Sequence, residues 1–399
     1  MSDSNGGTGT RRSVARLWIQ GLLPLALLAV LTALFIRFGP LGVFRAAFPP
    51  LEDLTIERVR FSAPGEIEVF LVNGGPEAVT VAQLIIDEAY WIFEIEPGSE
   101  IPRLERAVIS APYPWVDGDP LLVTVITNTG VTFSREVEIA TLSPAPNARY
   151  LATFTLLGLY AGVIPVFLGV LWFPFLRDIQ RKWLHFFLSL TVGLLIFLGI
   201  DALHEALELA EEVPAAFQGV GLVVVGVLGA VLGLVAAGNW LRGRGAGGND
   251  RLWLAYMIAL GIGLHNLGEG LAIGASYAVG KISLGAFLVI GFAIHNTTEG
   301  FAIVAPVAKE RPALWHFVGL GALAGVPTIF GAWLGGFTYQ PTYATFFLAL
   351  GAGAIFQVVW ELGKLISRDS EAGWTAPLNA VGLVAGLLIM YTTALLVVA

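Results

Sequence analysis

The 399-residue sequence contains no cysteine. A disulfide framework, a thiolate metal site and a thiol nucleophile are therefore excluded, and a bound metal ion must be held by imidazole, carboxylate or amide groups. Cysteine usage leaves the redox compartment undetermined.

Charged residues are scarce as well. They form 13% of the chain, against about a quarter in an ordinary soluble protein, while apolar residues form 56%. This excess of apolar side chains indicates that most of the chain is surrounded by a lipid bilayer. Acidic residues outnumber basic ones by 30 to 22, which gives a formal charge of −8. Because no basic face is indicated, nucleic acid is excluded as a partner.

Nine apolar stretches are long enough to cross a bilayer, which takes roughly 20 residues. The first, residues 17–38, follows a polar tail with three arginines. Its apolar length exceeds the roughly 7 to 15 residues of a signal-peptide core, so residues 1–40 are predicted to be a cytoplasmic tail and an uncleaved signal-anchor helix. The pair Arg11-Arg12 leaves a cleaved signal peptide as the alternative.

Residues 51–142 have a different texture, with short runs of β-branched and aliphatic residues separated by turn sequences. Examples are the runs 67–72 and 121–127 and the turn sequence 73–76. About seven strands in about 90 residues predict a small all-β sandwich, of the immunoglobulin-like or fibronectin-like kind, at residues 41–147. This domain contains no histidine. We interpret it as a folding or interaction module whose ligand or partner is unknown.

Residues 148–399 contain the other eight stretches, which predict eight membrane-spanning helices at 151–173, 184–209, 215–241, 252–278, 282–307, 313–337, 343–365 and 376–398. Lysines and arginines gather in the loops after the first, third, fifth and seventh of these stretches. The positive-inside rule then places the N-terminus in the cytoplasm and the sandwich and the C-terminus outside. The predicted fold class is an all-α polytopic membrane bundle with one N-terminal transmembrane anchor and a small β-sandwich, located in the cell membrane.

Two of the eight stretches carry the same polar motif. The fourth contains HNLGEG at residues 265–270, and the fifth contains HNTTEG at residues 295–300. Between residues 261–273 and 291–303, seven of thirteen positions are identical. The motif is therefore an internal repeat centred on polar residues.

In each copy, histidine and glutamate are four residues apart and share one helix face. Both copies lie about 20 Å along their helices, near the bilayer midplane. Because consecutive spans are antiparallel, the two faces predict a cage of two imidazoles and two carboxylates, with two amides in reserve: His265, Glu269, His295, Glu299, Asn266 and Asn296. Such ligands suit divalent Zn, Fe, Mn, Co or Ni rather than Mg or Ca. The alternative is a set of hydrogen bonds across a helix interface, without metal.

Other polar groups within the spans predict a path to this site. Each ionisable group in a bilayer costs about 2.5 to 3.5 kcal/mol, so each needs a reason to be there. Three groups in the outward half of the second core span predict an entrance that attracts cations, Asp201, His204 and Glu205. Two groups in the inward half of the seventh predict an exit, Gln357 and Glu361. A solvated acidic helix end is the alternative for part of the entrance.

The motif at residues 265–270, its repeat at 295–300 and the glutamate at position 361 resemble the ZIP family of metal-ion transporters, over about residues 151–399. The resemblance implies a dimer-prone eight-helix bundle and a transported divalent transition-metal ion, zinc above all, with no organic cofactor. It also implies import toward the cytoplasm. Three positions depart from the family pattern: Gly268 and Thr298 replace the proline common in the motifs, and Val326 replaces a glutamate before Pro327.

Two other functions remain open. One is an intramembrane zinc-dependent hydrolase, since a His-carboxylate zinc site with an open position can activate water. No HExxH motif supports it, because His204-Glu205 is followed by Ala-Leu-Glu. The other is a metal-sensing receptor, which lacks a cytoplasmic part large enough to transmit a signal. A matched repeat on two antiparallel helices favours the central site of a transporter over an enzyme.

Overall fold

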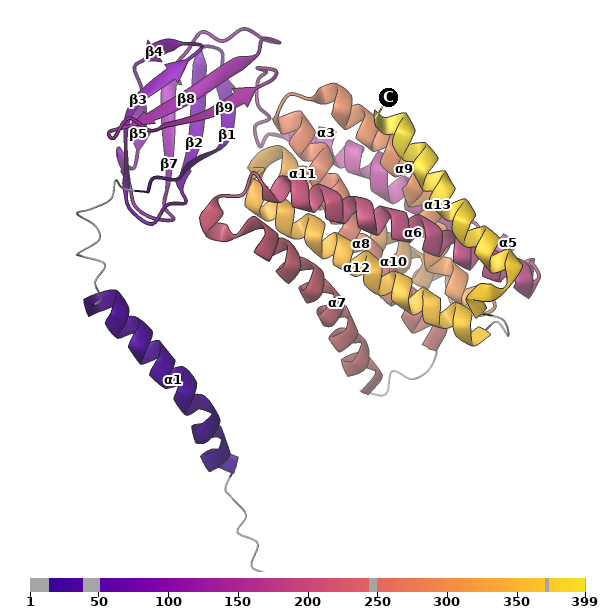
Figure 1. Cartoon of the computed structure of the whole chain (residues 1–399). Coiled ribbons are helices and arrows are strands. Elements are labelled where there is room, and N and C mark those ends of the chain that lie inside the picture. The colour runs from indigo at the N-terminus through magenta and orange to yellow at the C-terminus, as the bar shows by residue number, and fades with distance from the viewer. Residues whose placement is uncertain (1–13, 39–50, 244–249, 370–372, 399) are drawn as a thin grey trace, which may run out of the picture. The chain divides into compact units, whose positions relative to one another are not determined.

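The computed structural model describes residues 14–38, 51–243, 250–369 and 373–398 (Figure 1). The chain separates into two compact units, residues 1–51 and 52–399. The first contains the helix α1 (Val14–Phe38), which matches the first apolar stretch and has Pro24 inside it. The predicted cytoplasmic tail before it lies outside the described residues, as do the first residues of the predicted β-domain.

The second unit begins with two antiparallel sheets, of order β1-β2-β7-β5 and β4-β3-β8-β9, with β6 paired to β3. Their strands are β1 (Leu54–Ala63), β2 (Glu66–Asn73), β3 (Val79–Ile86), β4 (Ala89–Trp91), β5 (Glu94–Glu96), β6 (Glu100–Ile101), β7 (Arg106–Pro112), β8 (Leu121–Thr127) and β9 (Thr132–Val137). The described residues contain nine strands, more than the seven or so expected, and three of them, β4, β5 and β6, have three residues or fewer.

The two sheets share one apolar core. Alternate residues of β2 and β8 point inward, as a period of two requires, so Ile67, Val69, Val123 and Val125 are fully buried in one cluster. The domain therefore has its own interior.

Among the residues that the structure describes, the remaining helices contain eight segments that are long and apolar enough to cross a membrane, so the chain is a multi-pass membrane protein with a β-domain (Figure 1). The elements are α3 (Ala148–Gly158), η1 (Leu159–Val163), α4 (Ile164–Val170), α5 (Phe173–Asp178), α6 (Arg181–Ala210), α7 (Gly219–Gly243), α8 (Asp250–Ala278), α9 (Ile282–Val304), α10 (Leu314–Gly325), α11 (Pro327–Thr338), α12 (Pro341–Asp369) and α13 (Pro377–Val398). Short 3₁₀ turns lie at Ala215–Phe217, Ala305–Val307 and Gly373–Thr375.

The first and sixth spans are interrupted, which the apolar pattern did not predict. The first changes from α-helix to π-helix in η1 and returns to α-helix at Ile164, one residue before Pro165. The sixth is divided into α10 and α11 at Val326, immediately before Pro327. Proline has no N–H and clashes with the preceding turn, so each break has a local cause.

Glycines let the helices that carry the repeated motif approach their neighbours closely. A methyl group at Gly270 of α8 would lie 2.1 Å from the carbonyl oxygen of Thr328 on α11. A methyl group at Gly300 of α9 would lie 2.0 Å from the carbonyl oxygen of Val166 on α4. Helix α8 therefore packs backbone to backbone against the sixth span, and α9 against the first.

The β-domain contacts the ends of three spans. The polar contacts are Arg135 Nη2 to Glu212 Oε2 at 3.1 Å, Lys281 Nζ to Glu138 Oε1 at 2.7 Å, and Arg58 Nη1 to the Tyr339 carbonyl oxygen at 3.3 Å. Burial first, and then the negative charge of Glu212, raise the pKa of the Tyr339 phenol, so this group stays neutral at the junction. Partly exposed ion pairs contribute little stability, so these contacts orient the domain rather than hold the fold together.

Candidate metal centre

Both copies of the motif lie on unbroken helix. Residues 265–270 belong to α8 and residues 295–300 to α9. In each copy the i, i+4 spacing puts histidine and glutamate one turn apart on the same face. All six predicted ligand residues are buried, with exposed fractions between 0% and 7%. Both motif faces therefore point into the helical bundle.

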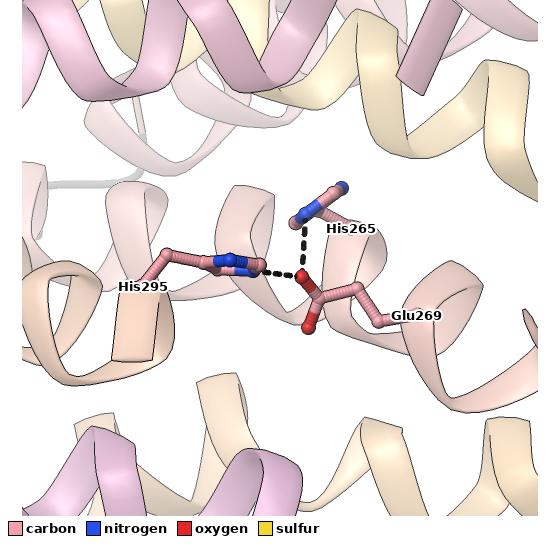
Figure 2. Close-up of side chains that lie close together, drawn as sticks. All are labelled: His265, Glu269 and His295. Carbon is pink, nitrogen blue, oxygen red and sulfur yellow. Dashed lines mark hydrogen bonds and ion pairs between the residues drawn. The ribbon is translucent and has the colours of Figure 1, made fainter. Parts of the chain in front are cut away.

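Three of the six side chains form one cluster. His265 Nε2 lies 3.1 Å from Glu269 Oε1, and His295 Nε2 also contacts Glu269 Oε1. Figure 2 shows the two imidazoles approaching this carboxylate from different sides. One ligand atom from each of the three residues lies within 4.8 Å of the others. The α8 residue Glu269 is thus shared between histidines of two helices.

The fourth expected ligand, Glu299, does not join this cluster. Its side chain is buried, and neither carboxylate oxygen has a hydrogen-bond partner among the described residues. It lies near enough to Glu269 for their charges to interact. A buried carboxylate is costly unless it is protonated or a cation neutralises it, so Glu299 is available as a further ligand beside the cluster.

The two asparagines hold backbone groups of neighbouring spans. Asn266 Nδ2 donates to the carbonyl oxygen of Ala324 at 3.1 Å. Asn296 Nδ2 donates to the carbonyl oxygen of Ala161 at 2.9 Å and to Glu269 Oε2 at 2.8 Å. The side-chain oxygens Oδ1 of both asparagines have no partner among the described residues. Each amide therefore has one end engaged and one oxygen free.

The donor set of the cluster fits a divalent transition-metal ion. Two imidazole nitrogens and one carboxylate oxygen are available, with a second carboxylate and two amide oxygens nearby. Imidazole with carboxylate binds Zn, Mn, Fe, Co and Ni well. The two carboxylates carry two negative charges, which one divalent ion would neutralise in a medium where unbalanced charge is costly.

The predicted entrance residues lie on α6 and are accessible at its surface. The charge of Asp201 interacts with His265 and His295, and that of Glu205 interacts with Glu269. His204 Nε2 lies 3.3 Å from Glu208 Oε1, one turn further along α6. Asp201, Glu205 and Glu208 thus form an acidic face of α6 whose charges lie within electrostatic range of the buried cluster.

The predicted exit residues lie on α12. Gln357 Nε2 donates to Glu361 Oε1 at 3.3 Å, and Lys364 Nζ contacts the same oxygen at 3.1 Å. All three line a cavity of about 230 Å³ together with Met257 and Ile258 of α8. Ile258 precedes His265 by about two helical turns, so this cavity lies about two turns from the cluster, toward the N-terminal end of α8.

Sequence reasoning missed the two backbone carbonyls that the asparagines hold. Ala161 and Ala324 carry no side-chain chemistry, and their oxygens matter only because proline interrupts both spans. Pro165 and Pro327 were the available signals: Pro165 lacks the N–H that would bond Ala161, and Pro327 coincides with the end of α10, which leaves Ala324 among its last carbonyls. Comparison with known proteins adds no further assignment, because no protein-family model and no curated protein matches the chain.

Proposed function

We propose that this protein is a membrane transporter of divalent transition-metal ions, with zinc as the foremost substrate. A single ion binds at the centre formed by His265, Glu269 and His295 and passes through the helical bundle. The proposal extends the resemblance of the repeated motif to ZIP transporters. Iron, manganese, cobalt and cadmium have the same ligand preferences and are the alternative substrates.

The buried cluster carries this proposal. Its three ligand residues have exposed fractions of 4%, 3% and 7%, and they come from two helices that are each long enough to span a bilayer. Polar groups at such depth need partners or a function. Two imidazole nitrogens that converge on one carboxylate oxygen form a set of nitrogen and oxygen atoms that a divalent transition-metal ion can bind together.

The direction and orientation are part of the proposal. The excess of lysine and arginine in alternate loops favours a cytoplasmic N-terminus, with the β-domain and the C-terminus outside the cell membrane. The acidic face of α6 is then the entrance, and Gln357 and Glu361 lie on the way to the cytoplasm. Import and a homodimeric assembly follow the family resemblance, while the β-domain supplies no member of the cluster.

A zinc-dependent hydrolase is the rival function, because two histidines and one glutamate are also the ligands of some catalytic zinc sites, and Glu299 could act as a base. Accessibility favours transport. A substrate with a scissile bond needs an open cleft, whereas the cluster residues are at least nine-tenths buried. A single ion can reach such a site through small movements of side chains.

Uptake by proteoliposomes tests the proposal directly. Purified protein is reconstituted, and the entry of Zn²⁺, Fe²⁺, Mn²⁺, Co²⁺ and Cd²⁺ is followed with a metal-sensitive dye trapped inside. We expect saturable uptake of at least one of these ions and none of Mg²⁺ or Ca²⁺. Protein-free liposomes are the control. Zinc-dependent cleavage of a peptide or lipid substrate without any uptake would favour the hydrolase.

The entrance makes a separate prediction. Replacing Asp201, His204 and Glu205 together by Asn, Gln and Gln should raise the apparent KM for uptake by about tenfold and leave the saturated rate nearly unchanged, because these groups concentrate cations near the cluster without ligating them. Glu211, exposed beyond the end of α6, supplies a matched control: neutralising this residue should have a smaller effect. A lower saturated rate at unchanged KM would contradict the entrance assignment.

A further inference from the structure

The breaks in the first and sixth spans each leave a backbone carbonyl without its helical donor. In a continuous α-helix the carbonyl of Ala161 would accept from the N–H of residue 165, which is a proline. The carbonyl of Ala324 is among the last four of α10, and these carbonyls have no partner within their own helix. Both carbonyls lie inside membrane-spanning segments, where water cannot replace the missing donor.

The asparagines of the repeated motif supply the missing donors. Asn296 of α9 donates to Ala161 at 2.9 Å, and Asn266 of α8 donates to Ala324 at 3.1 Å. Both asparagines are completely buried. The asparagine of each copy of the repeat thus donates a hydrogen bond to a free carbonyl of a different broken span. Two independent chance contacts would not be expected to match in this way.

The two breaks also touch each other. A methyl group at Gly162, in the π-helical turn, would lie 2.0 Å from Thr328 Oγ1 and 2.9 Å from the carbonyl oxygen of Gly325. Thr328 is fully buried, and its hydroxyl has no partner among the described residues. Polar groups and irregular backbone of both spans therefore meet at one crossing.

The asparagines connect this crossing to the cluster. Asn296 Nδ2 bonds both the Ala161 carbonyl and Glu269 Oε2, so a continuous chain of hydrogen bonds runs from the break of the first span to the shared ligand. The free Oδ1 atoms of Asn266 and Asn296 are buried acceptors that a cation could satisfy. An ion at the centre would thus act on the same amides that hold the two broken spans.

We infer that Asn266 and Asn296 are positioning residues that cap the proline breaks of the sixth and first spans, and that these spans bend at the breaks while an ion passes. The ion in this inference rests on the proposed function, whereas the capping does not. Discontinuous helices at a central site are common in transporters because they combine free backbone groups with freedom to move.

The capping is tested by thermal unfolding of the full chain in detergent, after treatment with a chelator. Asn296→Leu keeps the branching and the number of heavy atoms of the side chain and removes the donor, so Tm should fall by about 2 to 6 °C. Adding Pro165→Ala restores an N–H four residues after Ala161 and should recover about half of that loss or more. The remainder reflects the lost bond to Glu269, which the proline substitution does not replace.

Pro174→Ala is the matched control, because Pro174 lies in the same span but in the first turn of α5, away from the break. It should leave the loss caused by Asn296→Leu unchanged. If Asn296→Leu does not fold, Asn266→Leu with Pro327→Ala provides the comparison on the sixth span, because removing Pro327 lets the helix continue so that the Thr328 N–H can donate to the Ala324 carbonyl. Strictly additive Tm changes in the pair that folds would overturn the capping.

The bending is tested by transport and binding together. With Asn296 intact, Pro165→Ala should reduce the saturated uptake rate at least about fivefold while the Kd for Cd²⁺ stays within about twofold, because the ligands remain and only the hinge stiffens. Uptake at the wild-type rate would overturn the bending. If the wild-type protein takes up no divalent ion, the proposed function and the bending both fail, and the Tm comparison still decides the capping.

Discussion

Replacing His265, His295 or Glu269 by alanine is expected to reduce metal uptake by a factor on the order of a hundred or more, because loss of an outer-shell partner alone can cost 10- to 100-fold in affinity. These three residues provide the clustered ligand atoms, and Glu269 Oε1 contacts both imidazoles. Removing it leaves two histidines without their shared anion. The same variants should bind Cd²⁺ weakly in calorimetry.

Two further variants sharpen this prediction. Glu269→Gln keeps the shape of the side chain and removes its charge. If the carboxylate is a ligand, this variant should lose metal uptake as Glu269→Ala does. His316→Ala is the matched control, since His316 pairs with Tyr256 at 2.9 Å, away from the cluster. It should keep at least about half of the wild-type uptake. Full uptake by the double variant His265→Ala, His295→Ala would refute the site.

Substituting the glycines between the closest helices is expected to have the other large effect. A methyl group at Gly300 would lie 2.0 Å from the Val166 carbonyl oxygen, a backbone atom that cannot move without its helix. Gly300→Ala should therefore separate α9 from α4, lower the free energy of unfolding by about 1–3 kcal/mol and abolish uptake, because the ligand His295 lies on α9 and moves with it. Thermal unfolding and uptake measure the two effects.

Gly229 of α7 provides a control, because alanine at this position is expected to leave the free energy of unfolding unchanged or to raise it. A methyl group there would meet nothing within 4 Å. Alanine is favoured over glycine inside a helix by about 1 kcal/mol, so Gly229→Ala should be neutral or stabilising and should transport normally. Equal losses for Gly229→Ala and Gly300→Ala would mean that helix packing at α9 does not set the geometry of the site.

Local features of the sequence predicted the membrane helices and the strands well. A bilayer requires about 20 apolar residues per span, so the eight spans follow from composition alone. Alternation of buried and exposed residues likewise marks strands such as β2 and β8. The interruption of the first and sixth spans was not predicted, because apolar patterning is indifferent to whether a turn is α-helical or π-helical.

The sequence also predicted which residues are candidate ligands and which helix faces carry them. Histidine and glutamate four residues apart must share a helix face, and the repeat at an offset of thirty indicated that α8 and α9 present equivalent faces. Of the two imidazoles and two carboxylates expected to form a metal cage, three cluster in the structure, and Glu299 lies outside that cluster. The rotation and separation of α8 and α9, which the sequence does not give, determine that Glu299 lies outside the cluster.

The sequence by itself thus determined which residues are polar within the membrane and which of them share a helix face, because both depend only on local composition and on the helical repeat. Tertiary structure alone decided that Glu269 serves both histidines and that Asn266 and Asn296 hold the carbonyls of Ala324 and Ala161. Those partners lie 58 and 135 positions away in the chain, and only the glycine-mediated packing of the helices brings them within hydrogen-bonding distance.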